Sequence, residues 1–356
     1  MRKNETILQL LPFDSGKVET RAVLRKEAEA RQALAELKGY ASVIPNQNIL
    51  ISAIVLREAK ESSAIENIIT THDELYRNLA ISSDYADSSA KEVINYREAV
   101  YKGFDIVRKK QMIRVSDIVR IQETIIENNA GIRRLPGTSL VNDATQKIIY
   151  TPPQDYNDLL NLLNNFCEYF NSSENCLWKM ALLHYQFECI HPFYDGNGRT
   201  GRILNILYLL LKEYLDSPVL YLSSYIIQNK NDYYSLLQET RKTKKYEPWI
   251  IYMLNGIEEI SKKTLEKIRI IRNSLEQTAV DVKEKCPGIY SKELIELIHE
   301  NPYSKIDFLV KKLGVNRKTA SKYLKELEKY QFLSHLNAGK EILYINTGLM
   351  EILKTP

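Results

Sequence analysis

Apolar side chains recur with a helical period along most of this 356-residue chain, and no other feature limits the fold as much. Only 13 glycines interrupt that period, so few positions favour a turn. A stretch rich in Ala, Glu, Arg and Leu at 19–37, and a segment that starts at Pro45 and runs towards Ser62, predict an N-terminal helical region. Ser and Asp residues at 82–89 predict a loop, and the next helix starts near Ala90. The fold class indicated is mainly α.

The helical period continues through the middle of the chain with one interruption. It predicts core helices near 115–128, 155–170 and 176–190. Between 133 and 153 the period fails, and two short strands at 139–141 and 147–150 surround the turn residues 142–145. We therefore expect a helical core that carries one short β-hairpin.

One short run combines a base, a carboxylate, glycines and two arginines: His191-Pro192-Phe193-Tyr194-Asp195-Gly196-Asn197-Gly198-Arg199-Thr200-Gly201-Arg202. The proline disfavours a helix at His191. Gly196 and Gly198 permit backbone conformations that let successive amides converge on an anion, and Asn197 can take a positive φ and adds a donor. Apolar residues recur from about Arg199, so this loop is predicted to open the N-terminus of a buried helix.

The chemistry of this run is that of a phosphate site. Free amides and the positive end of the macrodipole at a helix N-terminus favour phosphate. Arg199 and Arg202 are three residues apart, so both can project towards one polyphosphate. Asp195 offers Mg²⁺ a hard oxygen ligand, and His191 can accept a hydroxyl proton at neutral pH. Each feature alone is typical of an ordinary loop or surface, but their contiguity favours an active site.

The run matches the signature His-Pro-Phe-x-Asp/Glu-Gly-Asn-Gly-Arg-x-x-Arg at every defined position, and the chain thereby resembles the Fic (Fido) family. The resemblance implies a protein adenylyltransferase that moves AMP from ATP onto a Ser, Thr or Tyr hydroxyl of a target protein, or of itself, and releases pyrophosphate. It implies that His191 deprotonates the hydroxyl and that Asp195 holds Mg²⁺ between the α- and β-phosphates. The implied nucleotide-binding residues are Asp195, Gly196, Asn197, Gly198, Arg199, Thr200, Gly201 and Arg202.

A second segment, Ser62-Ser63-Ala64-Ile65-Glu66-Asn67, is similar to the inhibitory pattern Ser/Thr-x-x-x-Glu-Gly/Asn of that family. The resemblance implies autoinhibition by Glu66, with Ser62 and Asn67 completing the motif. Glu66 would pair with Arg202 and exclude the γ-phosphate, because one guanidinium cannot hold a carboxylate and a phosphate in the same bidentate way. The alternative is an ordinary exposed helix face, on which Ser-x-x-x-Glu is common.

Two further segments resemble substrate contacts of the family. The hairpin before the signature is similar to the Fic flap, which holds a target segment by strand addition, and Gln146, Lys147 and Ile148 would make that contact. The alternative interpretation is that this segment is a plain surface hairpin. Tyr233 is implied to contact the nucleotide, although packing is the commoner role of a tyrosine in a chain with 23 of them. Family members can place an asparagine eight positions later, where this chain has Arg241.

The C-terminal part shows a different pattern. A long helix opens at Pro248 and continues as a connector to about Lys285. Beyond it we expect three helices, at 291–299, at 305–313 and from 316 onwards. A hairpin follows them, with strands at 332–333 and 342–345 around the turn 337–340. This order resembles a winged helix-turn-helix, in which Arg317, Lys318 and Lys322 would lie at the start of the recognition helix.

Charge does not decide what such a domain binds. Residues 285–356 contain 12 basic and 8 acidic residues, an excess of 4, and winged helices also serve as protein-interaction modules. DNA is therefore one candidate partner.

The expected domains are an N-terminal helical region at 1–100, a catalytic core at 101–262, a connector at 263–284 and the winged helix at 285–356.

Composition predicts a soluble, cytoplasmic protein. The four cysteines, which show no paired metal spacing, predict buried free thiols in a reducing compartment: Cys167, Cys176, Cys189 and Cys286. No signal peptide is evident, and the apolar stretch 203–211 is far shorter than the roughly 20 residues that cross a bilayer. The family resemblance also implies a homodimer.

Two function classes remain open at this point. The first is an autoinhibited adenylyltransferase with ATP and Mg²⁺, and the second is a DNA-binding regulator whose core senses a nucleotide. Within the first class, other Fic proteins transfer a different group, or remove AMP with the inhibitory glutamate acting on water. The intact signature favours the first class.

Overall fold

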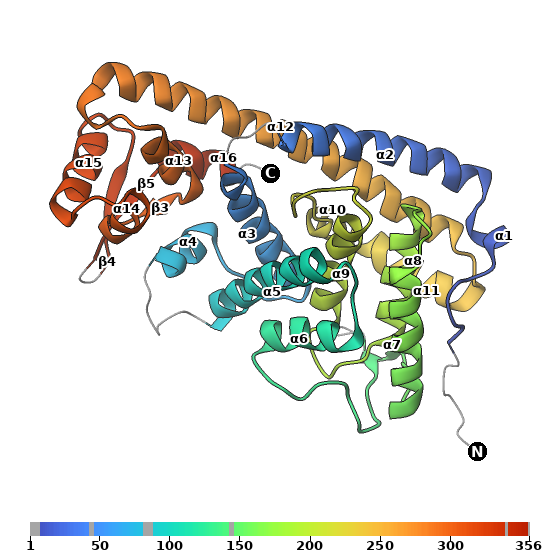
Figure 1. Cartoon of the computed structure of the whole chain (residues 1–356). Coiled ribbons are helices and arrows are strands. Elements are labelled where there is room, and N and C mark those ends of the chain that lie inside the picture. The colour runs from blue at the N-terminus through green and yellow to red at the C-terminus, as the bar shows by residue number, and fades with distance from the viewer. Residues whose placement is uncertain (1–7, 43–45, 81–87, 142–145, 339–340, 355–356) are drawn as a thin grey trace. The chain divides into compact units, whose positions relative to one another are not determined.

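The computed structural model describes residues 8–42, 46–80, 88–141, 146–338 and 341–354, and helices dominate within them (Figure 1). The mainly α fold class is thus confirmed. Most of the predicted loop at 82–89 and the whole turn at 142–145 lie outside the described residues. Within the described ranges, no helix combines the length and the hydropathy needed to cross a bilayer.

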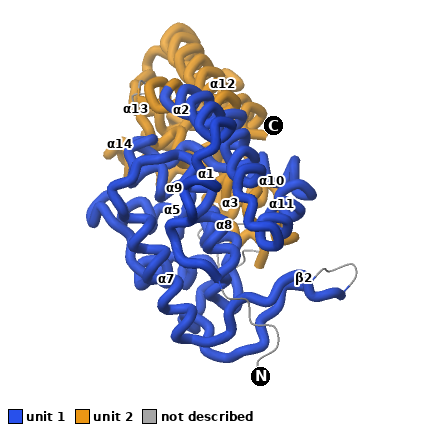
Figure 2. The backbone as a smooth tube through the Cα atoms, turned by 90° about the vertical axis from the view of Figure 1, so that its right-hand side faces the viewer, with its two compact units in different colours: residues 1–35, 95–261 blue, residues 36–94, 262–356 orange. Residues whose placement is uncertain are grey.

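The chain divides into two compact units (Figure 2). Unit 1 comprises residues 1–35 and 95–261, and unit 2 comprises residues 36–94 and 262–356. The boundaries fall inside the three helices α2 (Arg21–Ala41), α5 (Ser88–Lys110) and α12 (Glu247–Lys285). The four expected domains stay a prediction, since this division groups segments by compactness and not by order along the chain.

Two buried helices form the centre of unit 1. Every residue of α8 (Trp178–Ile190) is buried, and so is nearly every residue of α9 (Asn197–Leu211), which packs against it. Because α8 is buried on all sides, it lies inside the core of unit 1. The helices α6 (Val115–Ile126) and α7 (Tyr156–Asn171) pack against α9 and α8 respectively. The loop between α8 and α9 is therefore anchored at both ends in the core.

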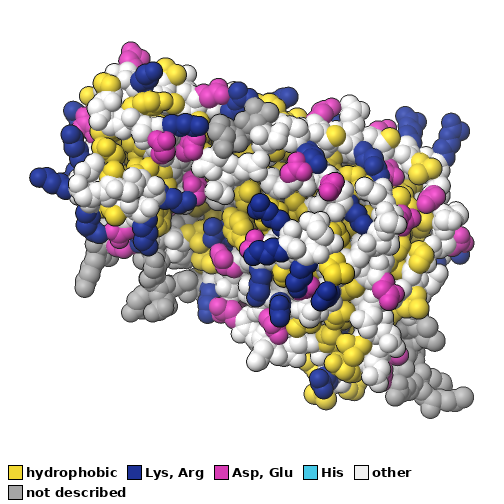
Figure 3. All heavy atoms as spheres, viewed as in Figure 1, with side chains coloured by type: hydrophobic (Ala, Val, Ile, Leu, Met, Phe, Trp, Pro, Cys, Tyr) yellow, Lys and Arg dark blue, Asp and Glu magenta, His cyan; other side chains and the backbone are white. Residues whose placement is uncertain are grey.

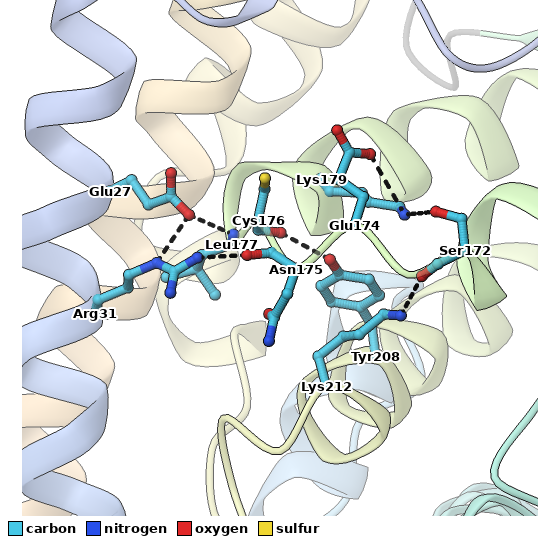
Figure 4. A network of polar contacts seen from close by, with 10 residues as sticks. All are labelled: Glu27, Arg31, Ser172, Glu174, Asn175, Cys176, Leu177, Lys179, Tyr208 and Lys212. Atoms are coloured by element: carbon cyan, nitrogen blue, oxygen red, sulfur yellow. Dashed lines mark hydrogen bonds and ion pairs between the residues drawn. The ribbon is translucent and has the colours of Figure 1, made fainter.

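The N-terminus of α8 is capped from a distant helix (Figure 4). Its own N-cap residue, Leu177, makes no side-chain cap, but its amide donates to Glu27 Oε1 of α2 at 2.5 Å. The same carboxylate accepts from Arg31 Nε at 3.0 Å. Tyr208 of α9 donates to the Cys176 carbonyl at 2.7 Å. This network fixes the turn that leads into α8, because it satisfies backbone groups that the helix itself leaves open.

The remaining elements of unit 1 surround this centre. They are α1 (Ser15–Val18), α10 (Ser223–Gln228), α11 (Lys230–Thr243), the first part of α12, and the strands β1 (Leu140–Val141) and β2 (Ile148–Tyr150). Trp249 of α12 is buried and donates to the Ala181 carbonyl at 2.7 Å. The strands pair antiparallel, which confirms the predicted hairpin, and Figure 2 shows β2 projecting away from the helices.

Unit 2 contains the end of α2, followed by α3 (Gln47–Ile65) and α4 (His72–Ala80). Helix α3 packs against α13 (Lys292–Glu300), and Ser52 Oγ donates to the Glu300 carbonyl at 2.9 Å. Tyr303 donates to Asp73 Oδ1 of α4 at 2.8 Å and stacks on Tyr76. Residues far apart in sequence thus share one core.

Within the described residues, the C-terminal segment of unit 2 has four α-helices, one short 3₁₀-helix and a small sheet. Its elements are η1 (Pro287–Ile289), α13, β3 (Tyr303–Ser304), α14 (Ile306–Leu313), α15 (Arg317–Lys329), β4 (Ser334–Ala338), β5 (Glu341–Ile345) and α16 (Thr347–Lys354). The antiparallel sheet has the order β3-β5-β4. Ser291 and Asn316 cap α13 and α15, and Gly314 takes φ +65° at the end of α14, as the turn requires.

Two predictions in this segment were wrong in detail. The strand expected at 332–333 begins at Ser334 and includes Asn337 and Ala338, which we assigned to the turn. Strand β4 is mostly exposed and its sequence, Ser-His-Leu-Asn-Ala, has no apolar alternation to reveal it. The two-residue strand β3 and the helix α16 were not predicted.

The four cysteines are free. Cys167, Cys189 and Cys286 are buried, as expected, whereas Cys176 is partly exposed. Burial raises the pKa of the Cys167 thiol to about 12, so this thiol stays protonated at neutral pH.

Candidate functional site

The signature run joins α8 to α9. His191 ends α8 in the left-handed conformation, with φ 46°, and Gly196 precedes α9 with φ 76°. Helix α9 begins at Asn197, two residues earlier than Arg199. This corrects the sequence-based expectation: Gly198 lies in the first helical turn, and Asn197 does not take a positive φ. The first amides of any helix lack intrahelical partners, so the start of α9 at Asn197 has the backbone geometry that an anion site requires.

The loop is closed by its own side chains. Asn197 Oδ1 accepts from the Phe193 amide at 2.9 Å, and Asn197 Nδ2 donates to the Phe193 carbonyl at 2.8 Å. Gln122 of α6 donates to the Asp195 carbonyl at 3.0 Å. The Asn197 amide group, which we expected to act as a donor to an anion, therefore shapes the loop.

Two glycines of the run allow close approach of neighbouring side chains. A Cβ atom on Gly196 would lie 2.9 Å from two side-chain carbons of Ile126. A Cβ atom on Gly201 would lie 2.9 Å from Glu188 Oε1. Both positions need glycine for space, and Gly196 also needs it for its backbone conformation.

The charged residues of the run lie together at this turn. Arg199 and Arg202 are 2% and 5% exposed, and Arg199 Nη2 lies 3.3 Å from Asp195 Oδ1. The Asp195 side chain is 65% exposed, and its Oδ1 also accepts from the Gly196 amide. Among the described residues, no three His, Cys, Asp or Glu side chains group to hold a metal ion. One exposed carboxylate beside an anion-binding turn suits Mg²⁺ that completes its shell with phosphate oxygens and water.

His191 is held as a neutral base. Burial lowers the pKa of its imidazole to about 4, and the positive charges of Arg241 and Arg133 act in the same direction. The Glu188 carbonyl and Asp195 oppose that shift. The ring is therefore uncharged at neutral pH, which is the form that a general base needs.

Sequence reasoning missed Arg133, which holds the turn between α8 and α9 from one side. Its Nε donates to the His191 carbonyl at 2.9 Å, and its amide donates to the Pro192 carbonyl at 3.0 Å. A guanidinium nitrogen also donates to the Pro153 carbonyl. No local pattern marks this arginine, because all these partners are distant in sequence.

Tyr233 lies in an aromatic cluster under α8. Its side chain is 3% exposed, and its hydroxyl lies 2.8 Å from His184 Nε2. Asn205 Nδ2 lies 3.2 Å from His184 Nδ1, so we assign the proton of the neutral ring to Nε2, which donates to Tyr233. The ring of Trp249 stacks on His184. Tyr233 thus packs as a core residue, and its contact with a nucleotide stays a prediction.

A cavity of about 350 Å³ lies beside α11. It is lined by Tyr225, Asp232, Ser235, Leu236, Pro248, Ile251, Tyr252 and Asn255. None of these residues belongs to the signature, so this cavity is separate from the anion-binding turn.

The hairpin presents apolar side chains to solvent. Ile148 is 66% exposed, Val141 is also exposed, and Gln146 and Lys147 precede β2 on the surface. In the described ranges β2 is paired only with β1, which leaves its other edge open to a further strand. An exposed apolar ribbon with an open edge suits strand addition.

The motif Ser62 to Asn67 lies at the end of α3 in unit 2. Ser62 is buried, Glu66 is the C-cap residue, and Asn67 takes φ 64°. The Ile68 amide donates to the Ser63 carbonyl at 3.1 Å, which closes the helix end. Gly and Asn tolerate this left-handed conformation best, so the backbone explains the Gly/Asn choice at that position.

Models of one family match three parts of the chain. The "Fic/DOC family N-terminal" model matches residues 24–105, and the "Fic/DOC family" model matches residues 112–209. A third model, "Protein adenylyltransferase SoFic-like, C-terminal domain", matches residues 275–349. The central match contains the whole signature run.

Curated relatives agree with these matches. The chain is 27% identical over 177 residues to a protein adenylyltransferase Fic of Aedes aegypti, and 29% identical over 159 residues to one of Nematostella vectensis. These alignments cover 48% and 42% of this chain, and 33% and 34% of the relatives. The chain thus spans about a third of their length.

Solved structures show the same fold. A Fic family protein from Desulfovibrio desulfuricans has a TM-score of 0.57 at 19% identity, over 95% of this chain and 98% of that one. Fic-1 from C. elegans has a TM-score of 0.54 at 16% identity, over 71% of this chain and 74% of that one. With the signature at the turn between two buried helices, and three family models along its length, the chain belongs to the Fic/DOC family.

Proposed function

We propose that this chain transfers AMP from ATP to a Ser, Thr or Tyr hydroxyl of a protein and releases pyrophosphate. The observation that carries the proposal is a neutral histidine at the entrance of a helix N-terminus that also holds two buried arginines. The similarity to relatives named protein adenylyltransferase Fic supports the same reaction.

The residues divide the chemistry among them. The target hydroxyl oxygen attacks the α-phosphorus, the bond to the pyrophosphate oxygen breaks, and His191 accepts the hydroxyl proton. The amides at the start of α9, with Arg199 and Arg202, stabilise the charge that moves onto the leaving pyrophosphate. Asp195 would hold Mg²⁺, which neutralises phosphate charge when it is bound. The open edge of the hairpin, at Ile148, aligns the target segment.

Regulation follows from the same arginine pair. We infer that Glu66 forms an ion pair with Arg202 and keeps the γ-phosphate out of its productive position. The carboxylate and the phosphate compete for one guanidinium, so the unmodified chain has low activity. Ser62 and Asn67 would fix the helix end that carries Glu66.

Label transfer from ATP with a radioactive α-phosphate tests this proposal. Glu66→Ala is expected to raise transfer to protein at least tenfold. Glu61→Ala is the matched control, since Glu61 lies on the same helix and pairs with Arg57 at 2.9 Å. Adding His191→Ala to Glu66→Ala is expected to lower the rate by a factor of about 10² or more. Mass spectrometry of a labelled lysate then identifies the transferred mass and the acceptor residue.

Two results would contradict the proposal. If Glu66→Ala protein labels neither itself nor any lysate protein, the transferase assignment fails. If Glu61→Ala raises transfer as much as Glu66→Ala does, loosening of α3 and not a specific ion pair explains the activation. A transferred mass other than that of AMP assigns the chain to a different group transfer.

One observation supports a second candidate function, which is DNA binding by unit 2. Lys318, Lys322, Lys325 and Lys329 are exposed on α15 and follow one another at three or four residues, so they form one stripe. Figure 3 shows Lys and Arg side chains along the left margin, where α15 lies. The opposite side of the helix packs into the core through Ala320, Leu324 and Leu327.

Fluorescence anisotropy with a labelled DNA duplex tests this second function. This function is supported if the chain binds the duplex at low salt and the Lys322→Glu variant binds it more weakly. The Lys109→Glu variant, which changes α5, should bind as the unchanged chain does. No binding at low salt would exclude it. The two functions are independent, because the first concerns residues of the signature and the second concerns the stripe on α15.

A further inference from the structure

Helix α8 ends with carbonyl groups that the helix cannot satisfy. The Glu188 carbonyl would accept from the residue four positions later, but that residue is Pro192, which has no amide hydrogen. The amide opposite the Cys189 carbonyl belongs to Phe193 and donates to Asn197. Buried carbonyl groups need other partners, and a cation at a helix C-terminus is also favoured by the macrodipole.

Arg241, in the last turn of α11, supplies one partner. Its Nη2 donates to the Glu188 carbonyl at 3.2 Å, and its Nε donates to Cys189 Sγ at 3.3 Å. Its guanidinium carbon lies 4.0 Å from the centre of the Tyr150 ring. One side chain therefore contacts both the end of α8 and the last residue of β2.

Tyr150 supplies the second partner. It is buried at the end of β2, and its hydroxyl donates to the Cys189 carbonyl at 2.8 Å. The Tyr150 side chain thus contacts both the guanidinium of Arg241 and the end of α8, two residues before His191. The side chains of Arg241 and Tyr150 therefore connect the hairpin to the end of α8, which leads into the proposed catalytic residue His191.

We propose that Arg241 and Tyr150 form a clamp that fixes the hairpin to the end of α8, and that Arg241 is a positioning residue for transfer to the target hydroxyl. This inference rests on the proposed function, since it concerns the same reaction. The clamp holds the open edge of β2, where a target segment would pair, at a constant distance from His191. Arg241 occupies the position at which family members can have an asparagine on the nucleotide, but its guanidinium faces the backbone of α8.

The first test separates positioning from nucleotide binding. In the Glu66→Ala background, Arg241→Met keeps most of the side-chain volume and removes the charge and both hydrogen bonds. We expect kcat for label transfer to fall at least tenfold while the Kd for ATP stays within twofold. Arg97→Met is the matched control, because Arg97 also lies over a tyrosine, Tyr101 at 5.0 Å, away from the signature. It is expected to leave both values within twofold.

The second test does not depend on activity. Amide hydrogen exchange of residues 148–150 and 189–191 is expected to speed up at least tenfold in Arg241→Met and in Tyr150→Leu, with little further change in the double variant, because one clamp is lost in each case. Tyr150→Phe keeps the ring and removes the hydroxyl, so exchange should rise at residues 189–191 more than at 148–150. Thermal unfolding confirms that each variant is folded.

Three results would overturn the clamp. A Kd for ATP that rises as much as kcat falls would make Arg241 a nucleotide contact. Unchanged exchange at residues 148–150 would show that Arg241 does not hold the hairpin. Additive effects of the two substitutions on exchange would show that the side chains act separately. If Glu66→Ala protein transfers no label at all, the proposed function fails, and the exchange result still decides the clamp.

Discussion

In the proposed function His191 is the base, so its protonation state sets how the reaction depends on pH. Burial, followed by the charges of Arg241 and Arg133, lowers the pKa of this imidazole to about 4. The active form is the neutral ring, so activity is retained above that pKa and is lost as the pH falls through it. An exposed histidine, with a pKa of about 6.5, would already be roughly tenfold less active at about pH 5.5 than at neutral pH.

We therefore expect label transfer by Glu66→Ala protein at pH 5.5 to be within about twofold of that at pH 7.5. The measurement is kcat at saturating ATP and Mg²⁺, with circular dichroism at each pH to verify folding. A decline of about tenfold over that interval would show that the histidine titrates as an exposed group.

Gly196 shows why a single methyl group can disturb the anion-binding turn. Its φ of 76° is strained for any residue with a Cβ, and that atom would lie 2.9 Å from Ile126. Gly131 has a similar φ of 65° but nothing within 4 Å of its Cβ position. Gly196→Ala should cost about 1–2 kcal/mol for the backbone and a further 1–3 kcal/mol for the contact, whereas Gly131→Ala costs only the first part.

Urea unfolding of the two variants measures that difference, and ATP titration measures its consequence at the site. Gly196→Ala should weaken ATP binding and Gly131→Ala should not. Equal destabilisation by both substitutions would mean that Ile126 moves aside without cost.

At the scale of elements, the N-terminus of α8 depends on another helix. Glu27 accepts from the Leu177 amide and from Arg31, and the carboxylate is almost fully buried. Its loss leaves a buried amide and a guanidinium without that acceptor. Glu27→Ala should therefore destabilise unit 1 by about 1–3 kcal/mol.

Glu29→Ala is the control for that substitution. Glu29 lies on the same helix and pairs with Arg25 and Lys26, but its side chain is 45% exposed, so it should change stability by no more than about 0.5 kcal/mol. Urea midpoints compare the two variants. Equal effects would show that α8 starts at Leu177 without help from α2.

Several element boundaries could be predicted because their signals are local. Asp155, Ser291 and Asn316 each cap the helix that follows them, as their short polar side chains suggest. The cap of α8 could not be predicted, because Glu27 lies 150 positions before Leu177. Short-range patterns cannot show a partner that only the packing of α2 against α8 brings close.

At the scale of the whole molecule, buried histidines make stability depend on pH. Burial lowers the pKa of His184 to about 3 and, with help from nearby cations, lowers those of His191 and His72 to about 4. It also lowers the pKa of His299. The first two lie in unit 1 and the others in unit 2. Since the unfolded chain binds these protons more readily, stability is complete above pH 6.5 or so and is lost as the pH falls towards 4.

Each of His184, His191 and His72 costs on the order of 2 kcal/mol at about pH 5 relative to neutral pH. Urea midpoints for both units should therefore fall between pH 7.5 and pH 5.0, and His299→Gln should reduce the loss in unit 2. Identical midpoints at the two pH values would show that these rings take up protons in the native state.

The sequence alone determined the helical fold class, the core helices around the signature and the residues of the signature itself. These depend on periods and caps that are complete within a dozen residues. The tertiary structure decided which groups the signature residues contact. Asn197 closes the loop, Glu27 caps α8, and Arg241 with Tyr150 satisfies the end of that helix. A buried carbonyl needs a donor, but the donor can come from any distance along the chain, so only the packed core selects it.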